Sequence, residues 1–165
     1  MSETSDTFVE RVVGATFLSV DTFEEVEADQ SATLQAAMVV AIVVVALGIG
    51  AAGSGTLPAV FSATGAVIQW AVWAGICYLV GAKLFGGEAT WDELLHTLGF
   101  AQAPGILWLF AIVPILGRPF FAIVPLWVAV ASFIAIRQAL DIGNGKRVLT
   151  ILVALGVSGF LETIF

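Results

Sequence analysis

The side chains that could do chemistry in this 165-residue chain are few and far apart. His96 is the only histidine and Cys77 the only cysteine, so the sequence has no zinc-ligand spacing and no cysteine–histidine cluster. No serine has a base nearby in the sequence, and no glycine-rich phosphate loop occurs. These residues predict a protein that is not an enzyme and that needs no cofactor or metal.

Five polar residues within apolar stretches remain as candidates for a site inside a membrane: Gln69, Gln102, Ser132, Ser158 and Glu162. Hydrogen bonding between helices is the more common role for such amide and hydroxyl groups. Gln102 and Pro104 form the most informative pair, because a proline frees a backbone carbonyl that an amide could bind. A broken helix is a feature of transporter sites. A small transporter or channel with a site near Gln69, Gln102 and Pro104 is therefore the alternative function.

The composition determines which elements must position these residues. Hydrophobic residues make up 59% of the chain and charged residues 12%, which excludes an ordinary soluble domain. Residues 30–82 carry no charge, and this run is more than twice the roughly 20 residues that one membrane crossing needs. Glycines and prolines divide the chain into five predicted spans: Leu34–Gly53, Gly65–Leu84, Leu94–Gly117, Pro119–Ile136 and Val148–Phe165.

The predicted fold is thus all-α: a polytopic bundle of five transmembrane helices. A turn at Gly53–Pro58 separates the first two spans. The third and fourth spans could instead form one broken hairpin, because the Gly117–Arg118 corner is short and prolines crowd the region. Residues 1–30 form an acidic cytoplasmic segment with a short amphipathic helix, and residues 31–165 form the membrane domain.

The charges indicate orientation and exclude some partners. The net charge is −7, and eight of the 13 acidic residues lie within the first 30 positions. This distribution argues against a nucleic-acid partner and against a polybasic lipid-binding arm. With the N-terminus inside, Lys83, Arg137, Lys146 and Arg147 are cytoplasmic and only Arg118 is outside. We therefore expect a cytoplasmic N-terminus and an extracytoplasmic C-terminus.

Two polar segments are expected at the cytoplasmic face. Apolar residues recur at helical spacing from Phe8 to Phe17, with Arg11 off that stripe, and Asp21 is a candidate cap for a second helix over residues 22–28. Packing of this acidic segment against the basic residues of the cytoplasmic loops (Lys83, Lys146 and Arg147) is expected.

In the second loop Thr90 can cap a helix, and Glu93 can return the bond, while Asp92 suits the positive helix end. Trp91 and His96 are expected at the headgroup level, with His96 solvated or singly hydrogen-bonded.

Small residues four positions apart recur in the predicted spans: Ala46 and Gly50, Gly48 and Ala52, Ala71 and Gly75, and Ala154 and Ser158. Such pairs let helices approach closely, either within one bundle or between copies of the chain. Packing within the bundle is the default, and a homo-oligomer stays open.

Two stretches resemble the Yip-domain family of five-span membrane proteins. The first, residues 83–104, contains a Leu-Phe-Gly-Gly turn, the Trp91-Asp92-Glu93 helix start, and Leu-Gly99-Phe followed by Pro104. The second, residues 135–147, contains Arg137, Lys146 and Arg147 and resembles the connection between spans four and five. Residues 17–25 resemble the segment before the first span, although a proline common there is absent.

The resemblance implies a non-enzymatic role in membrane organisation or trafficking. Eukaryotic members of the family bind Rab-type GTPases and one another, through a long cytoplasmic N-terminal region. Here only an acidic segment of some 30 residues precedes the first span, which argues against GTPase binding. The chain resembles the compact prokaryotic branch, which places it in the cell membrane. Its expected partners are membrane lipids, a protein at the cytoplasmic face, and a second copy of itself.

Overall fold

The computed structural model describes residues 7–50 and 56–164, and most of their side chains. The described residues form helices: α1 (Phe8–Thr16), α2 (Val20–Ala28), α3 (Ala32–Gly50), α4 (Thr56–Cys77), η2 (Tyr78–Leu84), α5 (Trp91–Phe100), η3 (Ala103–Ile112), α6 (Pro114–Leu140) and α7 (Asn144–Ile164). The η2 segment is π-helical and continues α4, whereas η3 is a 3₁₀ helix. The fold is therefore all-α, as predicted.

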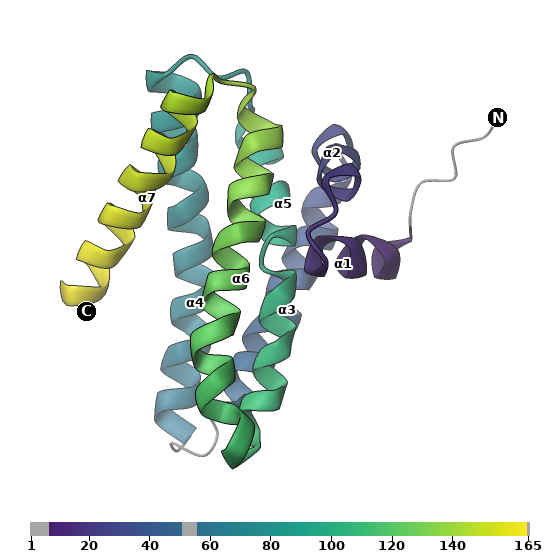
Figure 1. Ribbon diagram of the computed structural model, residues 1–165, viewed down its shortest axis with the longest axis vertical. Helices are drawn as coiled ribbons and strands as arrows, with labels where there is room; N and C mark the ends of the chain where they lie inside the picture. Colours follow the sequence, from purple (N-terminus) through teal and green to yellow (C-terminus); the bar gives the residue numbers. More distant parts are fainter. Residues whose placement is uncertain (1–6, 51–55, 165) are drawn as a thin grey trace.

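The long helices form an upright bundle. Helices α3, α4 and α6 and the α5–η3 pair lie along its long axis, while α1 lies across it (Figure 1). Within the described residues, four segments are long and apolar enough to cross a membrane: Ala32–Gly50, Val67–Leu84, Trp91–Ile112 and Ala122–Leu140. They correspond to the first four predicted spans.

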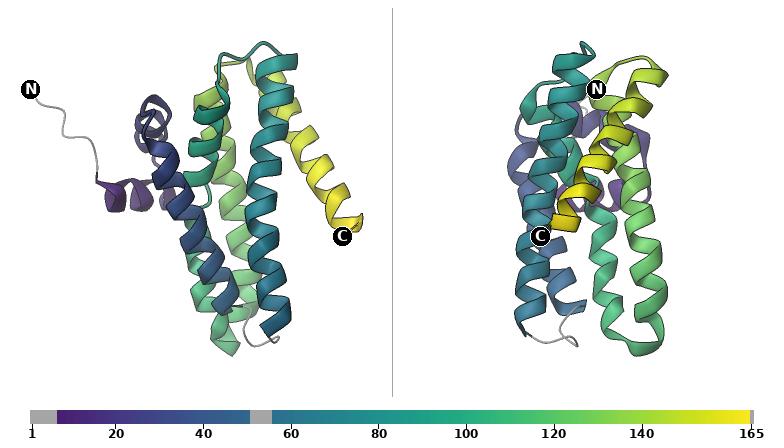
Figure 2. Two further views of the ribbon diagram at one scale, coloured as in Figure 1. Left: turned by 180° about the vertical axis from the view of Figure 1, so that it is seen from behind. Right: turned by 90° about the vertical axis from the view of Figure 1, so that its left-hand side faces the viewer.

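Helix α7 covers the fifth predicted span up to Ile164, and Phe165 lies outside the described residues. The helix leans away from the bundle and ends well short of the bundle's lower end (Figures 1 and 2). The count of five crossings stays a prediction. The predicted turn at Gly53–Pro58 lies partly outside the described residues, and its last three residues already belong to α4.

The third span is broken. Helix α5 ends at Phe100, and the chain continues as ten residues of 3₁₀ helix, an unusual length for that conformation. At the break, the Gly105 amide donates to the Gln102 carbonyl at 2.7 Å. The predicted corner at Gly117–Arg118 is wrong, because the chain turns at Val113 and both residues lie inside α6. Pro114 explains this position: proline is accommodated at the first helical residue, where its missing N–H is not needed.

Small side chains bring α3 and the third span together. Ala32, Ala36, Val39, Val43 and Ala46 are buried on one face of α3. A Cβ atom at Gly99 would lie 2.7 Å from the Ala36 Cβ, and one at Gly105 would lie 2.5 Å from a Val43 methyl group. Of the predicted small pairs, Ala46 and Gly50 face this contact, whereas Gly48 has open space beside it. Packing within the bundle is confirmed for that pair.

The N-terminal helices rest on the bundle. Thr7 and Glu10 form a capping box at the start of α1, and the Trp127 indole N–H donates to the Thr16 carbonyl at 2.8 Å. The predicted amphipathic helix is present, and its exposed apolar residues are Val9, Val13 and Phe17. The predicted Asp21 cap is wrong: Ser19 caps α2, which therefore begins at Val20, one residue before Asp21.

Candidate interaction face

Four parts of the chain meet at one end of the bundle, which we call the end face: α2, the connections 85–90 and 141–143, and the helix turns that flank these connections (Figure 1). Six of the predicted interaction residues lie in those turns: Trp91, Asp92, Glu93, Arg137, Lys146 and Arg147. The fold thus brings together residues that are up to 56 positions apart in the sequence.

The start of α5 has the predicted cap. The Thr90 amide donates to Glu93 Oε2 at 2.8 Å, and the Glu93 amide donates to Thr90 Oγ1 at 3.2 Å. The Trp91 ring packs edge-on against Tyr78, with centroids 5.9 Å apart, and Lys83 Nζ lies 5.0 Å from the Tyr78 centroid. Because of the two bonds with Thr90, the Glu93 carboxylate is held at the start of its own helix.

Arg11 holds the N-terminal helices in place. Its side chain is only 3% exposed, and it forms ion pairs of 2.7 Å with Glu25 and with Asp29. Arg11 Nη1 also donates to Gln35 Oε1 at 3.0 Å. One guanidinium therefore joins α1 to α2, to the α2–α3 connection and to α3. Sequence reasoning missed this role, although Arg11 is the only basic residue among eight acidic ones in the first 30 positions.

The charges in this network perturb two pKa values. Hydrogen bonds from Ser31 and Arg11 lower the pKa of Asp29 to about 2. Burial lowers the pKa of Arg11, but its hydrogen bonds and charge interactions with Glu25 and Asp29 outweigh that effect and raise it overall. Both groups are therefore charged at neutral pH, and the network is ionic.

His96 is a second link. It is buried on α5, with Nδ1 3.3 Å from Thr33 Oγ1 and Nε2 3.3 Å from the Glu27 carbonyl oxygen. The predicted solvated or singly bonded ring is wrong, because α2 and α3 close over it. Within residues 7–50 and 56–164, no cluster of three histidine, cysteine or acidic side chains could hold a metal ion.

Acidic side chains surround a cleft of about 350 Å³ on the end face: Glu27, Glu88, Glu93 and Asp141, together with Gln138 and Ala139. Burial, followed by the negative charges of Glu93, Glu24 and Asp141, raises the pKa of Glu27. The acidic N-terminal segment was predicted to pack against Lys83, Lys146 and Arg147, and these partners are wrong. Arg11 binds Glu25 and Asp29, and Gln138 donates to Glu24.

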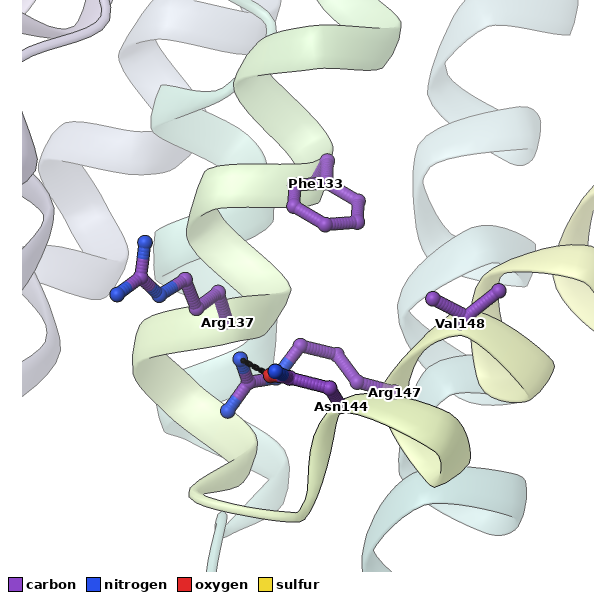
Figure 3. Close-up of a pocket in the computed structure, with 5 residues that line it drawn as sticks. All are labelled: Phe133, Arg137, Asn144, Arg147 and Val148. Atoms are coloured by element: carbon purple, nitrogen blue, oxygen red, sulfur yellow. Dashed lines mark hydrogen bonds between the residues drawn. The ribbon is translucent and has the colours of Figure 1, made fainter.

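A second cavity, of about 400 Å³, lies between α6 and α7 and is lined by Phe133, Arg137, Asn144, Arg147 and Val148 (Figure 3). Arg147 donates to the Ile142 carbonyl at 2.7 Å and to Asn144 Oδ1 at 3.1 Å. The buried Arg147 Nε has no hydrogen-bond partner among the described residues. We call this cavity the arginine pocket.

The other predicted residues lie deeper. Gly99 and Pro104 are buried, Gln102 is half-buried at the break in the third span, and Gln69 is half-buried on α4. Neither of the two cavities contains any of these four residues. Ser132 is buried, and the side chains of Ser158 and Glu162 lie outside the described residues.

A family model described as the Yip1 domain matches residues 15–163. The match extends from the end of α1 to the last turn of α7. No curated protein and no solved structure matches the chain.

Proposed function

Because the chain belongs to the Yip1-domain family, we propose that it is a non-enzymatic membrane protein that organises membranes or membrane traffic by binding other proteins. Binding takes place within the bilayer and at the end face. Family membership and the apolar helices place the chain in a membrane. The partner that we propose is a membrane-associated protein. A second copy of this chain would be one such partner.

The observation that carries the proposal is the anchoring of α2, one part of the end face, by contacts from α1, α5 and α6. Arg11 ties α1, α2 and α3 together, and His96 ties α5 to the same place. A surface whose parts are already fixed loses little conformational entropy when a partner binds. This preorganisation is what a recognition surface requires.

Charge supports a cytoplasmic location for the end face in the cell membrane. Lys83, Arg137, Lys146 and Arg147 all belong to helix turns or connections at this end. Positively charged loops tend to remain in the cytoplasm. The N-terminal segment is then cytoplasmic as well, since α2 packs at the end face, where the Gln138 amide donates to Glu24 Oε1.

Site-specific photo-crosslinking in cells tests the proposal. A photoreactive residue replaces Glu88 or Asp92, which are both exposed on the end face, and the control replaces Ile115, which is 86% exposed in the first turn of α6 at the opposite end. We expect discrete protein adducts from the two end-face positions that are absent from the control. Adducts with lipid alone, or the same protein adducts from all three positions, would contradict the proposal.

One observation favours the alternative function, a small transporter or channel. The third span is broken beside Gln102 and Pro104, and discontinuous helices line many transport sites. The arginine pocket and the acidic cleft do not include Gln102 or Pro104, and we propose protein binding as the first function.

A further inference from the structure

Two arginines line the arginine pocket, and neither forms an ion pair with a carboxylate of the described residues. Arg137 is exposed and, among the described residues, forms no ion pair or hydrogen bond. Arg147 donates only to a backbone carbonyl and an amide oxygen, and neither acceptor carries a charge. Among the described residues, both ion pairs are formed by Arg11, with Glu25 and Asp29. Among the described residues, no carboxylate lines the pocket.

The geometry of Arg147 suits a phosphate group. Its two bonds, to Ile142 and Asn144, fix the guanidinium plane, and its side chain extends from α7 towards α6 (Figure 3). The buried Nε has no hydrogen-bond partner among the described residues. A fixed guanidinium binds phosphate oxygens well, because its N–H groups match their spacing.

Two apolar residues, Phe133 on α6 and Val148 on α7, form the pocket walls that lie farther from the end face. Phe133 and Val148 are 41% and 46% exposed. Exposed apolar residues continue both faces away from the end face. On α6, Val130 lies three residues before Phe133, and Leu126 lies four residues before Val130. On α7, Leu152 lies one turn beyond Val148. An occupant with a charged head and an apolar tail would satisfy both parts.

We propose that the arginine pocket binds the phosphate headgroup of an anionic phospholipid, whose acyl chains lie along the exposed apolar faces of α6 and α7. Basic pockets between transmembrane helices near one membrane surface are known to bind such headgroups. The position of the pocket at the N-terminal end of α7 adds the positive end of the helix dipole. A soluble phosphate would use the arginines but not the apolar walls.

The test uses the full chain in nanodiscs that contain equal amounts of phosphatidylglycerol and phosphatidylcholine. After transfer to mild detergent, native mass spectrometry counts the lipids that each protein retains. We expect the wild type to retain phosphatidylglycerol in at least about tenfold preference, since each arginine contributes roughly fivefold near a membrane surface. Arg137→Gln/Arg147→Gln should retain both lipids equally.

The matched control is Lys83→Gln/Lys146→Gln, which removes two positive charges from the same end of the bundle but outside the pocket. It should keep the wild-type preference. Arg137→Gln alone guards against misfolding, because Arg137 has no partner to lose among the described residues, and it should lower the preference severalfold. Equal retention of both lipids by the wild type, or equal losses in the pocket variant and the control, would overturn the proposal. So would displacement of the lipid by millimolar inorganic phosphate, which would identify a free-phosphate site.

Discussion

Replacement of Arg11 by Met should release the N-terminal helices from the bundle. Methionine keeps most of the aliphatic stem but removes the guanidinium that binds Glu25, Asp29 and Gln35. Removing one member of a buried ion pair typically costs about 3–5 kcal/mol. Here the Glu25 and Asp29 side chains are 31% and 27% exposed, so water can partly hydrate them, and we expect about 2–3 kcal/mol.

Hydrogen exchange followed by mass spectrometry measures this loss locally. The exchange of residues 8–31 should accelerate by about 30- to 150-fold, whereas that of α4 and α6 should change little. Lys83→Met is the matched control, because it removes an exposed positive charge by the same kind of substitution. It should change exchange in residues 8–31 by less than about twofold.

Two further measurements separate the ionic network from simple packing. In a Glu25→Gln/Asp29→Asn background, Arg11→Met should cost much less, because no charge interaction with a carboxylate is lost. The lowered pKa of Asp29 also predicts a pH dependence: its stabilisation is present above its ordinary pKa of 3.8 and is lost as the pH falls through about 2. An exchange rate in residues 8–31 that rises equally in both backgrounds would refute the reasoning.

Three other perturbations follow from the packing and the charges. Gly99→Ala should destabilise the bundle by about 1–3 kcal/mol in detergent unfolding, because the new methyl group would collide with Ala36, whereas Gly48→Ala should be neutral or slightly stabilising. Glu27→Gln should raise the melting temperature at pH 7 and have no effect near pH 4, because the raised pKa of Glu27 means that its charge destabilises the fold as the pH rises through that pKa. If the chain is a transporter, Gln102→Leu should abolish solute flux in proteoliposomes; flux that survives would reject that site, and absence of flux in the wild type would count against the class.

The elements that depend on local chemistry could be predicted from the sequence. Hydropathy located four spans, because each crossing needs a long apolar run whatever its neighbours are. The Thr90–Glu93 cap was predicted because both partners lie within one helical turn. The corner after the third span was misplaced, since Pro114 and Pro119 are both plausible helix starts and only the packed bundle selects between them.

The parts that depend on distant contacts could not be predicted. Nothing near His96 in the sequence indicates that Thr33 and Glu27 enclose it, because those residues are more than 60 positions away. Arg137 and Arg147 were expected in one cytoplasmic connection, but the pocket itself was not expected, because it arises only where the packed helices α6 and α7 meet. Amphipathic spacing also placed Arg11 off the apolar stripe, yet the acidic neighbours that bury it belong to other helices.

The contacts of the N-terminal helices also set an order for the synthesis of the chain. The partners of Arg11 lie 14, 18 and 24 residues downstream, so this cluster can close soon after α3 leaves the ribosome. The partners of Glu27, Thr16 and Glu24 in the later helices lie 69, 111 and 114 residues downstream. Short-range contacts form first because they close small loops. The N-terminal helices can therefore fold onto the start of α3 first, and the later spans then insert and pack against them.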